Sequence, residues 1–228
     1  MGAAALATAL IAAAGSGERL GAGRPKALVE IAGRPLLAWS LAAVGGARSV
    51  GAVVVVAPPG YEEDVRAIAA GAQVVTGGAS RSESVANALR EVEGELVAVH
   101  DAARPLATSE LFDAVISELA GDPDCAALIA AAPIADTVKR ALGGRVIETV
   151  PRSELWAVQT PQAFRVEALR GALDTDPETL AGATDDASLV EAAGGVVRLH
   201  PVSAPNPKLT TESDLSAIEA ILRDRTSS

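Results

Sequence analysis

Two glycines, an arginine and a lysine near the start of the chain have types and spacing that suit a polyphosphate. They lie in Gly15-x-Gly17-x-Arg19 and Pro25-Lys26, directly after an apolar run of small residues. Glycines let backbone N–H groups approach phosphate oxygens, and the cations offset the phosphate charge. Pro25 fixes the backbone just before Lys26, so that the lysine can reach back into the loop. The pattern predicts a nucleotide-binding loop.

The spacing separates this loop from two common nucleotide motifs. Leu20 stands where the dinucleotide fingerprint needs its third glycine, and no Gly-Lys-Ser/Thr follows as a Walker A loop requires. Taken alone, the loop also fits a tight strand-to-helix turn with solvated cations.

A second cluster is Val99-His100-Asp101-Ala102-Ala103-Arg104-Pro105. Asp101 ends an apolar run and would stand at the carboxyl edge of a sheet, where ligands bind in open α/β folds. A carboxylate there can position a hydroxyl or a metal ion, and Arg104 can grip a phosphate bidentately. A helix-capping aspartate and a surface arginine are an equally good account of this segment alone. We expect His100 to pack and hydrogen-bond at the sheet edge rather than act as a base.

Three further turns carry a polar side chain. Gly78 precedes a helix that contains Ser84, a pattern typical of a helix cap or of a nucleobase pocket. Thr160-Pro161 predicts a rigid turn that offers a hydroxyl, and Lys208 lies in a proline-rich loop before the last helix. Each of these side chains, taken singly, fits a structural role as well as a binding one.

The composition limits the class of protein. With 228 residues, 49% hydrophobic and 21% charged, the chain can form one large domain with a full core. The net charge of -10 argues against extended contact with DNA or RNA. One cysteine, Cys125, excludes an internal disulfide, and the apolar segment Ala3–Ala14 is too short to span a bilayer. We therefore expect a cytoplasmic protein with no nucleic-acid or membrane partner.

Short apolar strands alternate with amphipathic helices, an arrangement that brings strand ends to one edge. Strands are expected at Ala5–Ala14, Val50–Ala57, Val74–Thr76, Leu96–His100, Ala126–Ala132 and Val196–His200. Helices are expected at Pro35–Val44, Tyr61–Ala70, Ser82–Glu91, Ser109–Ala120, Val166–Ala172, Asp185–Ala193 and Glu212–Arg223. This alternation predicts an α/β fold with a mostly parallel sheet between two layers of helices. No linker divides residues 1–228 into two domains.

The pattern changes at Asp136–Arg140 and Arg145–Val150, which flank the hairpin signal Gly143-Gly144. The predicted hairpin is rich in cations and has little apolar surface of its own, so it cannot be stable alone. We expect it to pack against a partner subunit.

Together these segments resemble one family, the 2-C-methyl-D-erythritol 4-phosphate cytidylyltransferases of the non-mevalonate isoprenoid (MEP) pathway. The resemblance covers nearly the whole chain and keeps the order of the motifs. The glycine-rich loop is typical of nucleotidyltransferases at large, whereas His-Asp-Ala-Ala-Arg-Pro at 100–105 and Asp-Thr-x-Lys at 136–139 are much narrower. Shorter matches are Ser84-Val85, Thr160-Pro161-Gln162 and Lys208-Leu209-Thr210.

The resemblance implies a single Rossmann-like domain and a homodimer that pairs through a projecting β-arm, here about Asp136–Trp156. It implies in-line attack of a polyol phosphate on the α-phosphorus of CTP, with loss of pyrophosphate. The product would be 4-diphosphocytidyl-2-C-methyl-D-erythritol. Mg²⁺ or another divalent cation would bridge the CTP phosphates, near Asp101 but with no side chain assigned as its direct ligand.

The resemblance also assigns roles to residues. Catalytic roles fall to Arg19, Lys26, Asp101, Arg152 and Lys208. CTP would be bound by Ala13, Ala14, Gly15, Gly17, Arg19, Lys26, Gly78, Ser84, Asp101 and Lys208. The polyol phosphate would be bound by Asp101, Arg104, Thr160 and Lys208, with Thr137 and Arg152 reaching it from the other subunit's arm.

Two positions depart from the family's pattern: Ala79, where some relatives carry Asp, and Pro207, where an aliphatic residue is usual.

The nearest alternative function is that of a D-ribitol 5-phosphate cytidylyltransferase of the same fold. An NAD(P)-dependent oxidoreductase would need an acidic residue where Ala57-Pro58-Pro59 stands. A non-catalytic nucleotide-binding regulator would be expected to lose a phosphate-binding cation, and none is lost.

Overall fold

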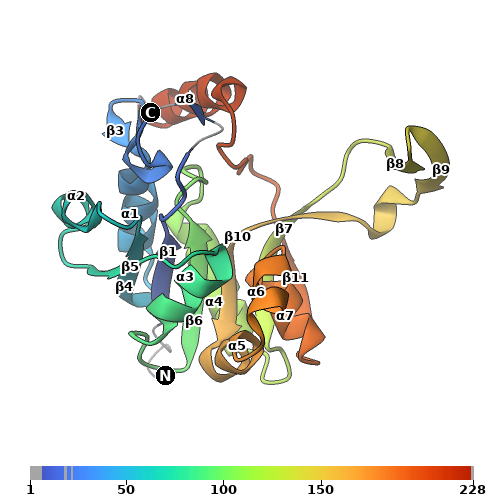
Figure 1. Ribbon diagram of the computed structural model, residues 1–228, viewed down its shortest axis with the longest axis horizontal. Helices are drawn as coiled ribbons and strands as arrows, with labels where there is room; N and C mark the ends of the chain where they lie inside the picture. The colour runs from blue at the N-terminus through green and yellow to red at the C-terminus, as the bar shows by residue number, and fades with distance from the viewer. Residues whose placement is uncertain (1–6, 18–19, 22, 227–228) are drawn as a thin grey trace.

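Seven strands form one sheet in the order β11-β7-β10-β6-β1-β4-β5 in the computed structural model, which describes residues 7–17, 20–21 and 23–226 (Figure 1). Parallel pairs join β1 (Ala7–Ala12), β4 (Val50–Ala57), β5 (Gln73–Thr76) and β6 (Leu96–Asp101), and also β7 (Ala127–Pro133) and β11 (Val197–Pro201). β10 (Trp156–Arg165) runs antiparallel between β6 and β7. The predicted α/β fold with a mostly parallel sheet is confirmed.

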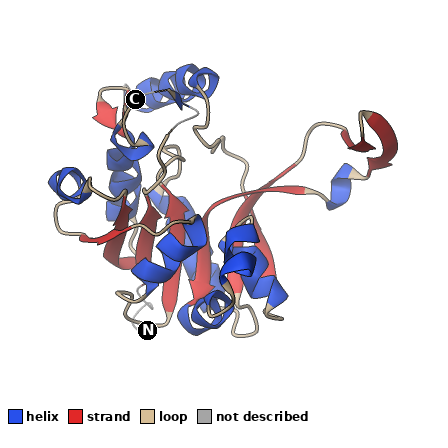
Figure 2. Ribbon diagram, in the orientation of Figure 1, coloured by secondary structure: helices blue, strands red, loops and turns tan. Residues whose placement is uncertain are grey.

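Helices cover both faces of this sheet (Figure 2). Their bounds are α1 (Leu36–Gly46), α2 (Glu62–Ile68), α3 (Arg81–Leu89), α4 (Ser109–Ala120), α5 (Val166–Leu173), α6 (Pro177–Gly182), α7 (Asp186–Ala192) and α8 (Glu212–Thr226). Residues of α1, α2 and α4 pack into the core on one face, and residues of α3, α5 and α7 into the core on the other.

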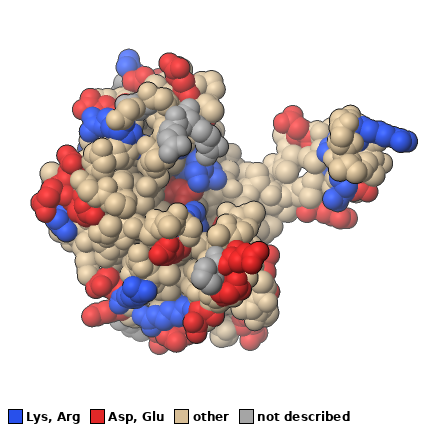
Figure 3. All heavy atoms as spheres, in the orientation of Figure 1, with Lys and Arg blue, Asp and Glu red and all other residues tan. Residues whose placement is uncertain are grey.

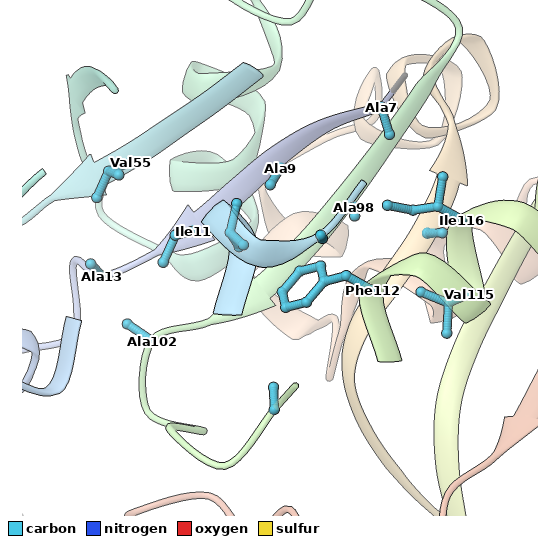
Figure 4. Packing of buried hydrophobic residues seen from close by; sticks show 14 of the residues in the cluster. Ala7, Ala9, Ile11, Ala13, Val55, Ala98, Ala102, Phe112, Val115 and Ile116 are labelled. Atoms are coloured by element: carbon cyan, nitrogen blue, oxygen red, sulfur yellow. The ribbon is translucent and has the colours of Figure 1, made fainter. Parts of the chain in front are cut away.

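Successive side chains of each strand point to opposite faces of the sheet, which explains the two cores. On β1, Ala9 and Ile11 belong to the α4 side, whereas Leu10 between them belongs to the α3 side. Figure 4 shows Ala9, Ile11 and Phe112 of α4 in the first of these cores. Because both faces of β1 are buried, its sequence is a nearly continuous apolar run. Packing on both faces fixes the direction in which β1 leads into the loop at Gly15.

Most of the predicted elements are confirmed to within a few residues. Val50–Ala57 and Ser109–Ala120 have the predicted bounds, and the helix after Ser80 is capped by that serine, whose Oγ accepts a hydrogen bond from Glu83 N at 3.1 Å. The expected rigid turn at Thr160-Pro161 is wrong, because both residues lie inside β10. The strand accommodates Pro161 through a cis peptide bond and a break in register with β7 between Val158 and Gln162.

Short elements complete the chain. They are the 3-10 turns η2 (Lys26–Leu28) and η3 (Arg152–Glu154) and the strand pair β2 (Glu30–Ile31) and β3 (Arg34–Pro35). A small third core joins α8 to Ile31, Leu36 and Leu209. This contact fastens α8 and the loop before it to β2 and to the start of α1. None of the helices in the described ranges is long and apolar enough to cross a membrane.

The hairpin predicted around Gly143-Gly144 is present as β8 (Val138–Leu142) and β9 (Arg145–Val150). Both turn glycines have positive φ, at 56° and 79°, which this tight turn requires. Extensions of β7 and β10 carry the hairpin well away from the main sheet (Figure 1). We call residues 136–156 the arm.

Candidate active site

A cavity of about 650 Å³ opens at the carboxyl ends of β1 and β6. The strand order reverses at β1, since β4 follows on one side of it and β6 lies on the other. Ligands bind at such a switch point in open α/β sheets. The lining residues are Ala12–Gly17, Lys26, Ala27, Gly78–Arg81, Ser84, Asp101–Ala103 and Lys208.

The loop after β1 folds closely against Lys26. Lys26 N donates to Gly15 O at 3.2 Å, and Gly17 has φ of 77°. A Cβ on Gly17 would come within 3.0 Å of Lys26 N, so only glycine allows this approach. The Lys26 side chain lines the cavity, and its Nζ donates to Leu209 O at 2.9 Å. Arg19, the other predicted phosphate-binding cation of this loop, lies outside the described residues.

Gly77 lets the loop after β5 approach the loop after β1, and Gly78 lets it approach the side chain of Glu83 on α3. A Cβ on Gly77 would lie 2.6 Å from the Cβ of Ala14, and one on Gly78 would lie 2.4 Å from the Glu83 side chain. Ser84 Oγ accepts from Gly78 N at 3.0 Å and donates to Ser80 O at 2.8 Å. The Ser84 hydroxyl therefore holds this wall of the cavity in shape, while the side chain also lines it.

Asp101 is the centre of a charged network at the end of β6. Its Oδ2 accepts from Lys208 Nζ at 2.6 Å and its Oδ1 from Arg81 Nε at 3.3 Å. Arg81 also donates through NH1 to Oδ2 of Asp186 at 2.6 Å. Burial would raise the pKa of Asp101, but the charges of Arg81 and Lys208 outweigh it and hold the pKa well below its usual range. Asp101 is therefore a carboxylate at neutral pH.

Sequence reasoning missed two members of this network, Arg81 and Asp186. Each is the first residue of a helix, α3 and α7, directly after a capping residue. A place at the start of a helix explains each residue locally, and the two residues lie 105 positions apart in the sequence. The one signal that could have pointed to a paired charge is the doubled aspartate at 185 and 186, since a helix needs only one cap.

Arg104 and Thr160 lie beside the cavity but do not line it. Arg104 donates through NH1 to Asn206 O at 2.7 Å and through NH2 to Val158 O at 3.2 Å. Thr160 Oγ1 accepts from Asp101 N at 3.0 Å. In this chain both side chains therefore brace the backbone that carries Lys208 and Asp101.

His100 packs and hydrogen-bonds at the end of β6, as predicted, and it does not line the cavity. It is fully buried, its ring meets Phe112 edge-on at 5.2 Å, and its Nδ1 lies 2.9 Å from Thr160 Oγ1. Burial lowers the pKa of His100 to about 4. The ring is neutral at pH 7 and supports the strand end that carries Asp101.

Thr137 and Arg152 belong to the arm and are exposed. Neither lines the cavity of its own chain, and Arg152 donates to the carbonyl of Ala135, the residue directly before the arm. Figure 3 shows charged side chains of both signs on the arm, apart from the main body. The predicted substrate contacts of these two residues therefore need another copy of the chain.

The described residues hold no group of three His, Cys, Asp or Glu side chains that could bind a metal ion. Asp101 is the carboxylate among the cavity-lining residues, and two cations already pair with it. This donor set fits a divalent cation held mainly by substrate phosphates, since Mg²⁺ is commonly bound by one or two carboxylates together with phosphate oxygens.

The sheet, the glycine-rich loop at its switch point and two cavity-lining lysines define an α/β nucleotide-binding protein of the nucleotidyltransferase class. The family model described as 2-C-methyl-D-erythritol 4-phosphate cytidylyltransferase matches residues 7–224. The chain belongs to this family of enzymes.

Individual relatives agree with this assignment. A 2-C-methyl-D-erythritol 4-phosphate cytidylyltransferase of Rubrobacter xylanophilus is 43% identical over 228 residues, covering 96% of this chain and 96% of that protein. One of Synechococcus elongatus is 41% identical over 225 residues, covering 95% and 96%. The crystal structure of the Thermus thermophilus enzyme of the same name superposes with a TM-score of 0.78 at 34% identity, covering 96% of this chain and 99% of that chain.

Proposed function

We propose that this chain transfers CMP from CTP to 2-C-methyl-D-erythritol 4-phosphate, giving 4-diphosphocytidyl-2-C-methyl-D-erythritol and pyrophosphate. One observation carries the assignment to this site: Lys26 and Lys208 line the same cavity, although they lie at opposite ends of the chain. Two ammonium groups at one glycine-lined switch point suit a reaction between two phosphate esters.

The walls formed by Ala13, Ala14, Gly15 and Gly78 would hold the nucleotide. These residues carry no side chain beyond a methyl group, so backbone N–H and C=O groups stay within reach of a base edge or a phosphate. The contact between Ala14 and Gly77 brings the two loops together on one side of the cavity. The cytosine ring would lie between them, with Gly17 and Lys26 next to the triphosphate.

The chemistry needs charge stabilisation rather than proton transfer. A phosphate monoester is ionised near pH 7 and needs no general base, but it must approach a second polyanion. Lys26, Lys208 and Arg19 would offset that repulsion and stabilise charge on the α-phosphate and on the leaving pyrophosphate. Asp101 is unsuited to be a base, because its pKa is held low; it would orient Lys208 instead.

A divalent cation such as Mg²⁺ would neutralise charge on the CTP phosphates when bound. Asp101, with its carboxylate at the cavity, would be the nearest side chain to it. The protein's own part is to place the two lysines at the cavity, where they would contact the phosphates.

The active unit would be a homodimer in which the arm of one subunit reaches the cavity of the other. The arm exposes Leu142, Val146 and Ile147 to 76%, 54% and 59%, a set of apolar side chains with no core of its own to enter. Docked on a second copy, the arm would bury them and bring Thr137 and Arg152 to the polyol phosphate. The buried free thiol of Cys125 suits the reducing cytoplasm, where we place the enzyme.

Pyrophosphate release tests the proposal. The purified enzyme is given CTP and Mg²⁺ with either 2-C-methyl-D-erythritol 4-phosphate or D-ribitol 5-phosphate, and ATP and UTP replace CTP in parallel. We expect release with CTP and the methylerythritol phosphate at least about tenfold faster than with any other pair. Faster release with ribitol 5-phosphate would overturn the choice of substrate, and no CTP-dependent release would overturn the proposed function.

A further inference from the structure

A line of four alternating charges runs from the interior to the cavity. Asp186 on α7 accepts from Arg81 on α3, Arg81 donates to Asp101 at the end of β6, and Asp101 accepts from Lys208. The two ends of the line differ most in exposure: the Lys208 side chain is 41% exposed and that of Asp186 0%, with Asp101 at 11% and Arg81 at 29% between them. Lys208 at the cavity is thus connected to the buried Asp186 through Asp101 and Arg81.

The inner end of this line is fixed by the fold. Asp185, the cap of α7, accepts from Ser188 N at 2.9 Å through Oδ1 and from Gln162 Nε2 of β10 at 3.0 Å through Oδ2. The next residue, Asp186, therefore holds its position relative to the sheet. Burial raises the pKa of Asp186, and the charge and hydrogen bond of Arg81 oppose that rise.

We propose that Arg81 is a positioning residue for the transfer reaction: anchored by Asp186, its guanidinium fixes the carboxylate of Asp101, which in turn fixes the ammonium of Lys208 at the cavity. The proposal rests on the proposed function. Arg81 already uses two donors of its planar fork, Nε toward Asp101 and NH1 toward Asp186, and so holds both carboxylates at once. Lysine, with one nitrogen, cannot make the same bridge.

The alternative is that Arg81 binds a substrate phosphate directly, since its side chain also lines the cavity. The two roles differ in their dependence on Asp101. A positioning residue acts only through Asp101, so its loss has little further effect once Asp101 no longer holds Lys208. A direct contact keeps its effect whether or not Asp101 is present.

A double-mutant cycle separates these roles. Arg81→Gln alone would leave Asp186 buried and unpaired, so the neutral pair Arg81→Gln/Asp186→Asn is combined with Asp101→Asn, and thermal unfolding checks that each variant folds. We expect the neutral pair to lower kcat by about ten- to a hundredfold with KM for CTP changed less than about threefold. In the Asp101→Asn background the same pair should change kcat by less than about threefold.

Several outcomes would overturn the proposal. An equal loss of kcat in both backgrounds would make Arg81 a direct substrate contact. A neutral pair that fails to lower kcat, or Asp101→Asn without effect, would remove the positioning role altogether. Arg81→Lys keeps the positive charge but not the planar guanidinium. We expect this variant to restore less than about a tenth of the kcat that the neutral pair loses. The matched control is the exposed pair Arg66→Gln/Glu63→Gln on α2, whose kcat should equal that of the wild type.

A second readout does not depend on catalysis. The chain has three lysines, Lys26, Lys139 and Lys208, so ¹³C-dimethylation gives few signals, each assigned by a Lys→Arg variant. We expect Arg81→Gln/Asp186→Asn to shift the Lys208 signal and leave that of Lys139 on the arm in place. An unmoved Lys208 signal would contradict the positioning role. If wild-type protein releases no pyrophosphate yet the Lys208 signal moves, the proposed function fails while the link from Arg81 to Lys208 stands.

Discussion

The cavity and the arm both carry charges, but they hold them in different ways. At the cavity, the ion pairs join residues 20, 105 and 107 positions apart, and three of the four members are mostly buried. On the arm, Arg140 pairs with Glu148 and Lys139 bonds Thr149, 8 and 10 positions away, and all four side chains are exposed. The first network is set by the fold of the domain, the second only by a hairpin.

This difference bears on function. Charges held by distant elements stay in place before substrate arrives, so they cost no reorganisation when the reaction occurs. Charges on an isolated hairpin have no such support and become ordered only against another surface. The cavity is therefore prepared within one chain, whereas the proposed contribution of the arm depends on a second copy.

The largest effect is expected from the lysines, which allow a matched comparison between the two regions. Lys26→Ala should lower kcat by about 10² to 10⁴-fold with an unchanged circular dichroism spectrum, because a cation near the reacting phosphates is lost. Lys139→Ala on the arm, which removes the same charge, should lower kcat by less than about threefold. Near-normal turnover of Lys26→Ala would contradict the assignment of the cavity.

The next effect concerns the apolar side chains of the arm. Ile147→Asp should weaken self-association by about tenfold or more, because a charge would enter the surface that the second copy buries in the proposed dimer. Sedimentation measures the dimer, and thermal unfolding should show a domain as stable as the wild type at concentrations where both are monomeric. A variant that dimerises as tightly as the wild type would exclude this side chain from the interface.

Acid should weaken the region behind the cavity through His100. Its pKa is lowered from 6.5 to about 4 by burial, so between these values the unfolded chain binds a proton that the folded one does not. Folding stability is therefore complete above about pH 6.5 and falls on acidification, by up to about 3 kcal/mol at pH 4. The paired Asp101 adds a second loss only at still lower pH, where its own carboxylate would be protonated in the unfolded chain.

Urea unfolding of the wild type and of His100→Asn across pH 4 to 7 measures this contribution. The variant should be less stable at pH 7, because it loses the ring that packs on Phe112, but its stability should vary less with pH. Parallel curves for the two proteins would rule out His100 as the titrating group.

The smallest effect is expected from the ion pair on the arm. Replacing Arg140 and Glu148 together by glutamine should change the free energy of unfolding by about 0.5 kcal/mol or less, since exposed pairs are well solvated. A loss well above about 1 kcal/mol in chemical denaturation would show that the arm is stabilised more like the cavity than its exposure indicates.

The sequence predicted those parts of the molecule that have local causes. The β-branched run Val50–Ala57 and the capped helix Ser109–Ala120 follow from residue types alone. β10 was missed because Thr160-Pro161 looks like a turn, and only pairing with β6 and β7 makes it a strand. The pairing partner of a strand is not encoded near it.

The same distinction holds for the candidate site. Lys26 and Asp101 were predicted from local patterns, a glycine-rich loop after one buried strand and the end of another, and the structure brings both to the cavity. Arg81 and Asp186 were not, because a pair formed across the whole domain leaves no local pattern. Arg104 was predicted to face substrate, and its bonds to two backbone carbonyls became visible only with the loop at Asn206 in place.

Mixed dimers test most directly whether a cavity of one chain works with the arm of another. Lys26→Ala and Arg152→Ala, each nearly inactive alone, are unfolded together and refolded at equal amounts, with mass spectrometry to show the mixed dimer. If the arm acts on the other subunit, activity should return to about a quarter of the wild type, because half of the dimers are mixed and each has one intact cavity. Activity that stays at the level of the two separate variants, with mixed dimers present, would contradict the shared site.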